Sequence, residues 1–352
     1  MKALLRLRLS ARRTASKGAF LGALAVSSLL LSGCIAAGIP VAAASMIGKD
    51  QIGKRKAKAK PAPQQAMVVP SSPGLAAAPP PPPRPTLDSP APPGMQFLYG
   101  SGEAAALSIQ AYQSLYNYLR MEAGFRRTKQ EVSSVVLARG STLAAPHFEE
   151  CGTKPLAAVF DVDETVLLNL GYEASDALRT GPYEEARWGR WEMSGADQVV
   201  TAPGALETIS AARREGITIV FNTNRSAINA AGTIAALTNA GLGPVAVGDT
   251  LWLKPEGGSS AKDERRWAIS QKYCVVALVG DQLGDFSDLF NAEGTTPLTR
   301  RNSASQTMTA PLWGSGWFIL PNPVYGTALK GSIGEIFPPE KRWTDPTEPP
   351  RP

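Results

Sequence analysis

The sequence is poor in the residues on which many hydrolases and metal centres depend. It has one histidine, His147, and three cysteines in 352 residues. A single histidine excludes Ser-His-Asp hydrolases and histidine phosphatases, and it leaves too few ligands for most zinc enzymes. Three cysteines are too few for a disulfide framework or a metal cluster. The chemistry of this chain must therefore come from other residue types.

The sequence also lacks an apolar run long enough to cross a bilayer, which takes about 20 residues. The run at residues 19–31 is shorter, follows a basic head without acids, and ends in Leu-Ser-Gly-Cys34. A basic head, a short apolar middle and small residues before a cut site predict a secretory signal peptide over residues 1–33. Its end resembles the bacterial lipobox, in which Cys34 becomes the lipid-modified first residue. Cleavage after the Ala-rich stretch near Ala44 is the alternative.

Positive charge is concentrated before the part expected to fold. Loss of residues 1–33 lowers the formal net charge from +6 to zero, and residues 34–88 carry a net +5, which leaves −5 for the rest. Nothing therefore favours binding to a nucleic acid polymer. The basic and Pro-rich composition of residues 34–94 cannot bury a core and predicts a disordered stalk.

The expected organisation is that of an exported protein, lipid-anchored to the cell envelope at the outer membrane or in the periplasm. Residues 95–340 are then one folded domain, and residues 341–352 form a Pro-rich tail. The domain is long enough to bury a core of good size. The sequence leaves the oligomeric state open.

Three short apolar runs predict neighbouring strands of a parallel sheet, at residues 156–160, 217–221 and 275–279. Helix-like segments lie between and before them, at residues 96–119, 206–215, 226–240 and 262–272. This alternation predicts an α/β fold: a doubly wound parallel sheet flanked by helices, with a small, mainly helical lid or accessory region. Ligands bind at the carboxyl ends of such strands, so the polar residues that follow the three runs should converge.

Two cysteines remain in the predicted domain, Cys151 and Cys274, each just upstream of a predicted strand. One bridge between them is conceivable because the two strands are expected to be neighbours. Two buried free thiols are the outcome that we expect instead.

The first run ends at Asp161-Val-Asp163-Glu-Thr165. Two carboxylates spaced i, i+2 directly after a buried strand suggest a nucleophile and an acid–base partner beside one metal. A carboxylate can attack phosphorus and form an aspartyl phosphate. The second carboxylate can protonate the leaving alkoxide and later activate water.

In this setting the chain resembles the haloacid dehalogenase (HAD) superfamily of phosphotransferases. Its Asp-x-Asp-x-Thr signature is matched at Asp161, Asp163 and Thr165. Asp163 favours phosphatase over dehalogenase chemistry, because attack on carbon has no use for an acid at i+2. The resemblance implies that Thr223, at the end of the second run, holds a phosphoryl oxygen.

The resemblance also implies a lysine that neutralises phosphate and nucleophile, and a second pair of aspartates. Lys262 is our choice for the lysine, and Lys254 is the competitor. In Gly-Asp-Gln-Leu-Gly-Asp, after the third run, Asp281 should ligate Mg²⁺ and Asp285 should support the site.

The implied cofactor is Mg²⁺, which prefers six oxygen ligands and usually keeps several waters. The side chains of Asp161 and Asp281, the backbone carbonyl of Asp163, a phosphate oxygen and waters would supply such a set. Together with a lysine, the cation would offset the repulsion between phosphate and an anionic nucleophile.

Further segments, spread from about residue 96 to 334, look like the class C bacterial acid phosphatases of the lipoprotein e type. They are residues 161–169, Trp188 and Trp191, residues 203–205, 223–225 and 280–286, the Lys262 helix, and residues 320–326. The resemblance implies hydrolysis of small phosphomonoesters, with 5′- or 3′-nucleotides as a frequent substrate class.

Aromatic side chains stack on nucleobases, and four of them are candidate substrate walls: Tyr172, Trp188, Trp191 and Tyr325. Ordinary core packing is the alternative for each. Asn224 and Arg225 either contact the phosphate or cap the next helix.

Two other functions remain compatible with the sequence. One is a phosphatase or phosphotransferase for a single non-nucleotide metabolite. The other is a non-catalytic surface lipoprotein on the same fold, which loss of Asp161, Asp163 or Asp281 would have supported. All three aspartates are present.

Overall fold

A computed structural model describes residues 84–347. The predicted signal peptide, Cys34, most of the predicted stalk and the last five residues of the tail lie outside the described residues. Among the described helices, none combines the length and the apolar character needed to cross a membrane.

The core of the fold is a parallel sheet of five strands in the order β5-β4-β1-β6-β7. The strands are β1 (Leu156–Phe160), β4 (Thr218–Ser226), β5 (Leu251–Lys254), β6 (Cys274–Gly280) and β7 (Trp317–Ile319). The three predicted runs form its centre, β4-β1-β6, as expected. The edge strands β5 and β7 were not predicted. Strand β4 also runs further than expected, so Thr223, Asn224 and Arg225 lie within it rather than after it.

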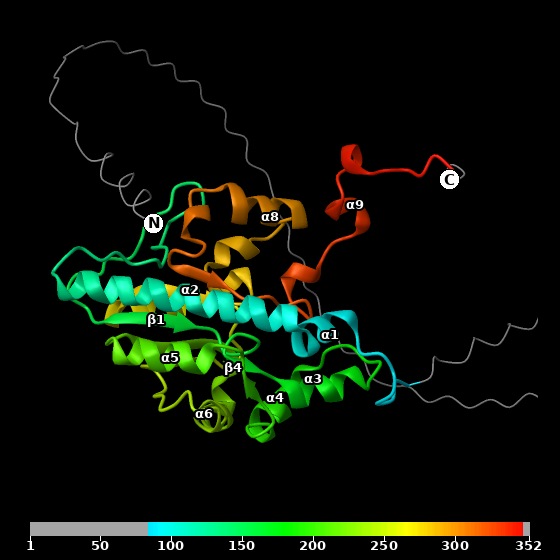
Figure 1. Cartoon of the computed structure of the whole chain (residues 1–352), viewed down its shortest axis with the longest axis horizontal. Coiled ribbons are helices and arrows are strands. Elements are labelled where there is room, and N and C mark those ends of the chain that lie inside the picture. Colours follow the sequence, from blue (N-terminus) through cyan, green and yellow to red (C-terminus); the bar gives the residue numbers. More distant parts are fainter. Residues whose placement is uncertain (1–83, 348–352) are drawn as a thin grey trace, which may run out of the picture. The chain divides into compact units, whose positions relative to one another are not determined.

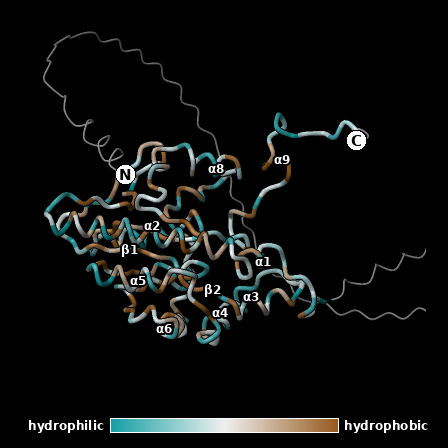
Figure 2. The backbone as a smooth tube through the Cα atoms, in the orientation of Figure 1, coloured by the Kyte–Doolittle hydropathy of each residue, from teal (hydrophilic) through white to brown (hydrophobic). Residues whose placement is uncertain are grey.

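Helices cover both faces of this sheet (Figure 1). One face packs against α2 (Gly102–Arg127), α5 (Ala205–Arg214) and α6 (Ala230–Asn239), and the other against α7 (Asp263–Lys272) and a segment around Val135. All five residues of β1 are buried, and Figure 2 shows the hydrophobic colour running along this strand. Burial on both faces explains why the run is apolar without alternation.

The helix boundaries follow local signals. The predicted helical region at residues 96–119 is two helices, α1 (Pro93–Gly100) and α2, because Ser101 ends one and caps the other by accepting a hydrogen bond from the Ala104 N–H at 3.0 Å. Gly216 and Gly241 follow α5 and α6 with φ of 81° and 76°, a conformation that glycine adopts without strain.

An accessory region lies between β1 and α5 in the chain. It consists of α3 (Leu170–Ala177), α4 (Glu185–Ser194) and a two-stranded antiparallel ribbon of β2 (Leu167–Leu168) and β3 (Val200–Thr201). This is the predicted small, mainly helical region. In the described part of the chain, β6 is followed by two α-helices, α8 (Pro297–Gln306) and α9 (Ile333–Ile336), and by short 3-10 turns.

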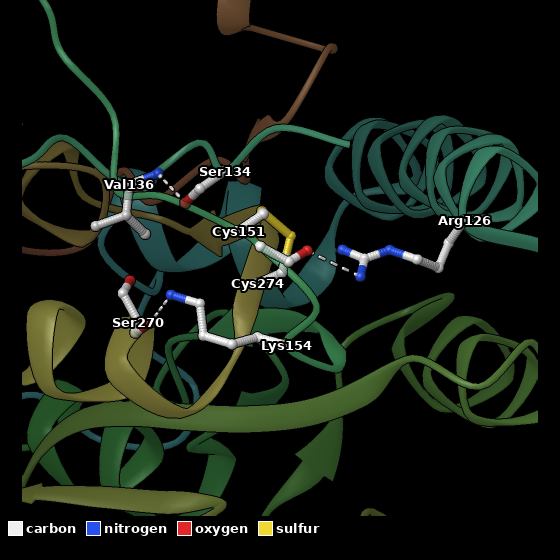
Figure 3. Close-up of a disulfide and its surroundings, with 8 residues drawn as sticks. Arg126, Ser134, Val136, Cys151, Lys154, Ser270 and Cys274 are labelled. Carbon is white, nitrogen blue, oxygen red and sulfur yellow. Dashed lines mark hydrogen bonds between the residues drawn. A yellow bond between two sulfur atoms is a disulfide. The ribbon is translucent and has the colours of Figure 1, made fainter. Parts of the chain in front are cut away.

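Cys151 and Cys274 form a disulfide, with 4.5 Å between their Cα atoms (Figure 3). The expectation of two free thiols is therefore wrong. Cys274 is the first residue of β6 and lies beside Leu156, the first residue of β1, so the segment that leads into β1 brings Cys151 to it. Lys154 fixes this segment by donating a hydrogen bond to the Ser270 carbonyl at 2.6 Å. The bridge thus joins the amino ends of β1 and β6.

Candidate active site

Asp161 and Asp281 directly follow β1 and β6, which are neighbours in the sheet. Oxygens of their carboxylates, together with one of Asp285, lie within 4.8 Å of one another. Asp285 reaches this position because residue 280 is glycine: a Cβ built there would lie 2.3 Å from the Cβ of Asp285. Asp285 also accepts a hydrogen bond from the Gln282 N–H at 2.9 Å. The sequence predicted that polar residues would meet at the carboxyl ends of the strands, and these three carboxylates do so.

Lys262 holds two of the three. It precedes α7, is 4% exposed, and donates hydrogen bonds to Asp161 Oδ1 at 2.5 Å and Asp285 Oδ1 at 2.7 Å. Burial acts to lower the pKa of Lys262, but the two carboxylates outweigh it and the pKa lies above its ordinary value. Lys254, the competitor, instead pairs with exposed Glu185 at 2.9 Å. The structure therefore brings Lys262, not Lys254, to the carboxylates.

Asp288 positions the start of the Lys262 helix. Its carboxylate accepts hydrogen bonds from the backbone N–H groups of Lys262, at 2.9 Å, and of Asp263, at 2.7 Å. These N–H groups belong to the first turn, where no helical carbonyl is available to them. Sequence reasoning missed Asp288, although it lies only three residues after Asp285.

Two carboxylates of this cluster, Asp161 and Asp281, have raised pKa values, as expected of acids buried close together. Burial raises the pKa of Asp161 well above its ordinary value; Lys262 opposes this rise, and Asp285 and Asp281 add to it. Burial raises the pKa of Asp281 to about 7, and Asp285 adds to the rise. A cation among these oxygens would stabilise their ionised forms.

The donor set fits a divalent cation that prefers oxygen ligands, as Mg²⁺ does. The carboxylates of Asp161, Asp281 and Asp285 would hold it. Asp285, which was expected only to support the site, lies in this cluster together with the predicted ligands Asp161 and Asp281. The expected role of the Asp163 backbone carbonyl stays a prediction.

Asp281 is oriented by three donors. Thr165 Oγ1 donates to its Oδ1 at 3.0 Å, and Asn322 Nδ2 and Gln282 Nε2 donate to its Oδ2 at 2.8 and 3.0 Å. Asn322 was missed in the sequence because β7, the strand that it follows, was not predicted.

Asp163 is paired with an arginine rather than a lysine. Arg225 donates from Nε and Nη2 to Asp163 Oδ1 at 2.9 and 2.8 Å, and Asn169 Nδ2 donates to the same oxygen at 2.9 Å. Arg225 is only 2% exposed. Burial acts to lower its pKa, but Asp163 outweighs this effect and raises it. The alternative that Asn224 or Arg225 caps the next helix is wrong, because Ser226 does so.

Thr223 and Asn224 bind Arg265, a buried residue that sequence reasoning missed. Arg265 donates to the Thr223 carbonyl and, at 2.6 Å, to Asn224 Oδ1. Burial lowers the pKa of Arg265 to about 10, against the opposing effect of Asp161. The Thr223 hydroxyl accepts a hydrogen bond from the Arg225 N–H at 3.1 Å. Its expected contact with a phosphoryl oxygen stays a prediction.

Glu164 ties this site to two distant segments. Its carboxylate accepts hydrogen bonds from the hydroxyls of Tyr99, at 3.2 Å, and Tyr325, and from the Asn169 N–H at 3.0 Å. Burial raises its pKa to about 8, and Asp163 adds to the rise. Glu164 has a φ of 54°, a left-handed conformation that a non-glycine side chain rarely adopts. Glu164 and Asn169 were given no role from sequence, although both lie in the segment that carries the family resemblance.

The four candidate aromatic walls differ in their surroundings. Tyr172 and Trp191 are buried and pack together with 6.0 Å between ring centroids, and Trp188 packs against Tyr172 at 4.9 Å. The core-packing alternative therefore describes Tyr172 and Trp191. Tyr325 is 38% exposed. Stacking on a substrate stays a prediction for Tyr325 and for half-buried Trp188.

Comparison with known proteins gives one family. The family described as HAD superfamily, subfamily IIIB (acid phosphatase), has a model that matches residues 104–328. Two solved structures of class C acid phosphatase from Bacillus anthracis are similar in fold, and each match covers 67% of this chain and 84% of the other. One is 24% identical with a TM-score of 0.50; the other, with tungstate bound, is 23% identical with a TM-score of 0.51.

Proposed function

The chain belongs to the acid phosphatases of subfamily IIIB of the HAD superfamily and is a phosphomonoesterase; we propose that it works through an aspartyl phosphate on Asp161, with Mg²⁺ as cofactor. One observation carries this proposal. The carboxylates of Asp161, Asp281 and Asp285 lie within 4.8 Å of one another, and the ammonium of Lys262 is 2.5 Å from Asp161. This arrangement combines a nucleophile, a cation site and a fixed positive charge.

The first step is attack by a carboxylate oxygen of Asp161 on phosphorus. Lys262 holds Oδ1, and none of the residues from 84 to 347 donates a hydrogen bond to Oδ2, so Oδ2 is the proposed attacking atom. The new O–P bond forms as the bond from phosphorus to the alcohol oxygen breaks. Asp163 gives its proton to that oxygen as the alcohol leaves.

The second step is hydrolysis of the aspartyl phosphate. Asp163, now a carboxylate, takes a proton from water as the water oxygen attacks phosphorus, and inorganic phosphate leaves Asp161 regenerated. Arg225 and Asn169 fix the orientation of Asp163 for both transfers. A Mg²⁺ ion held by Asp161, Asp281 and Asp285 would supply positive charge against the phosphate.

Metal removal and one conservative substitution test this mechanism. Protein lacking residues 1–33 should cleave an aryl phosphate with Mg²⁺, lose the activity in EDTA and regain it when Mg²⁺ is added back. Asp161→Asn should lower kcat by at least about 1,000-fold, the scale seen when a nucleophile is removed. Asp249→Asn, a change of the same kind at a half-buried aspartate outside the cluster of Asp161, Asp281 and Asp285, is the control. Full activity of Asp161→Asn would exclude the mechanism.

The leaving group tests the role of Asp163. A general acid contributes about 10²- to 10⁴-fold, and it matters most when the alcohol is a poor leaving group. Asp163→Asn should therefore lower kcat/KM far more for an alkyl phosphate than for a nitrophenyl phosphate. An equal loss on both substrates would assign Asp163 to another role.

Nucleoside monophosphates are the proposed substrates, since Tyr325 is a partly exposed residue and an aromatic ring can stack on a base. Tyr325→Ala should raise KM for nucleotides but not for glycerol phosphate, and Tyr325→Phe should keep the ring and most of the affinity. A higher kcat/KM for sugar phosphates than for nucleotides would instead favour a phosphatase for a non-nucleotide metabolite.

Export and a lipid anchor at Cys34 complete the proposal. Besides the sequence pattern, the Cys151–Cys274 disulfide supports export, because such bonds persist in oxidising compartments. The full chain should fractionate with membranes in high salt, and Cys34→Ala should release it. A Cys34→Ala variant that stays with the membranes would contradict the anchor.

A further inference from the structure

A cavity of about 580 Å³ lies between α1 and α3, and its lining includes none of the edge carboxylates, those of Asp161, Asp281 and Asp285. Most of its wall is apolar or uncharged, and its lining includes Met95, Tyr99, Leu170, Glu173, Ala174 and Ala177. A cavity of this volume is within the range of small-molecule sites, about 300 to 1,000 Å³. Nothing in the proposed phosphatase mechanism uses it.

Glu173 is the one acid in this lining, and it lacks a partner. It is 5% exposed, and no residue of the described part of the chain donates a hydrogen bond to its carboxylate or forms an ion pair with it. Arg187 acts on Glu173 only from a distance. Its guanidinium donates to Asp176 at 2.7 Å and to Ser175 at 2.8 Å, and it stacks over Tyr172 at 4.5 Å.

An unpartnered carboxylate at this depth is costly. Burial raises the pKa of Glu173 to about 7, so the charged form is disfavoured unless a cation or a hydrogen-bond donor reaches it. The opening between α1 and α3 is where a cation can approach. None of the described residues forms an ion pair with Glu173, so a cation that pairs with it must come from outside them.

We propose that this cavity binds a small organic cation, an ammonium or quaternary ammonium group on an apolar body. The carboxylate of Glu173 would meet the charge, Met95 and Leu170 would contact the apolar body, and the ring of Tyr99 would add a cation–π contribution. A phosphate or another anion does not fit, because the only charge on the wall is negative. A divalent metal does not fit either, because it needs several oxygen ligands and the wall offers one carboxylate.

The test uses a cation and its neutral isostere as probes on the full chain. Calorimetric titration with choline chloride should give saturable binding at least about tenfold tighter than binding of 3,3-dimethylbutan-1-ol, since only choline carries a charge that the carboxylate and the ring attract. Sodium chloride at equal ionic strength controls for salt. Absence of saturable choline binding at millimolar concentration, or equal binding of both probes, would overturn the proposal.

Matched variants locate the site. Glu173→Gln should weaken choline binding at least about tenfold and leave the isostere unchanged, whereas Glu103→Gln, the same change at an exposed residue of α2, should alter neither. Ala177→Leu should weaken both probes by filling the cavity while the carboxylate remains. This variant decides the matter if Glu173→Gln does not fold, because unchanged choline affinity in Ala177→Leu would overturn the proposal.

Phosphatase activity is a separate readout. Asp161→Asn should bind choline with wild-type affinity, since the cavity lining contains none of the edge carboxylates. Loss of activity without loss of binding thus separates the two proposals. Choline binding that disappears in Asp161→Asn would mean that the probe occupies the catalytic edge, and it would overturn the cavity assignment.

Discussion

The aspartates at the carboxyl edge of the sheet have cationic or amide donors from the chain itself, whereas the carboxylate of Glu173 in α3 has none among the described residues. Asp161 and Asp285 share the ammonium of Lys262, and Asp163 binds Arg225. Glu173 lines an apolar cavity instead. Burying a carboxylate is costly in both places. At the edge the protein offsets much of that cost internally, whereas at Glu173 the cost is avoided by protonation or, as proposed, offset by a bound cation.

The first way to test this contrast is to remove Lys262, the cation that the protein itself supplies to Asp161 and Asp285. Lys262→Ala should lower kcat by about 100- to 1,000-fold, the range for loss of one preorganised charge-stabilising donor. Lys254→Ala removes a surface ion pair with exposed Glu185, a kind of pair worth about 0 to 1 kcal/mol, and activity should stay within about twofold of wild type. Steady-state assays of both variants with one aryl phosphate give the comparison. An equal loss of kcat in both variants would contradict the assignment of Lys262 as the lysine that acts in the reaction.

The second way separates the chemistry of the edge from the stability of the strands that carry it. The disulfide joins the amino ends of β1 and β6, and the aspartates follow their carboxyl ends. Replacing both Cys151 and Cys274 by alanine should lower the free energy of unfolding by about 3 kcal/mol, since the bridge closes a long loop. Activity per folded molecule at 25 °C should be unchanged. Urea denaturation and an assay on the same sample measure both, and a lost activity with unaltered stability would contradict this division.

The third way neutralises the carboxylate that has no partner. The folded-state pKa of Glu173 is about 7, above its ordinary value near 4.5, so Glu173 favours folding when protonated. That contribution is complete below pH 4.5 and is lost as pH rises through 7. Glu173→Gln does not titrate, so its stability relative to wild type should rise between pH 5 and pH 8 by on the order of 2 kcal/mol.

Unfolding in urea at the two pH values measures this change. Asp176, Asp163 and Arg187 also act on Glu173 and remain present in both proteins, so they largely cancel in the difference. Glu103→Gln should show no such pH dependence relative to wild type. A stability difference that is the same at both pH values would mean that Glu173 has a partner in solution.

The centre of the fold could be predicted because its signals are local. The strands β4, β1 and β6 are continuous apolar runs, and the polar residues that follow them appear in the sequence beside the runs. Since the carboxyl ends of parallel strands share one edge, the meeting of Asp161 and Asp281 followed from the strand order alone. Strands β5 and β7 were missed because four and three residues carry too little pattern.

What depends on distant contacts could not be predicted. Cys151 and Cys274 are 123 residues apart, and only the pairing of β1 with β6 brings them together. The choice between Lys262 and Lys254 depended on which of the two lysines the fold places beside Asp161, and no local pattern shows this. The isolation of Glu173 is a property of what surrounds it, and no sequence pattern marks the lack of a partner.

Gly280 limits how this catalytic edge can vary. Any side chain at this position would collide with the Cβ and carboxylate of Asp285, which would have to leave its place beside Lys262. Under the proposed mechanism, homologues that keep Asp281 and Asp285 but replace this glycine are therefore expected to have lost activity. The identity of this one residue can therefore be used to separate homologous sequences that are expected to be active from those that are not.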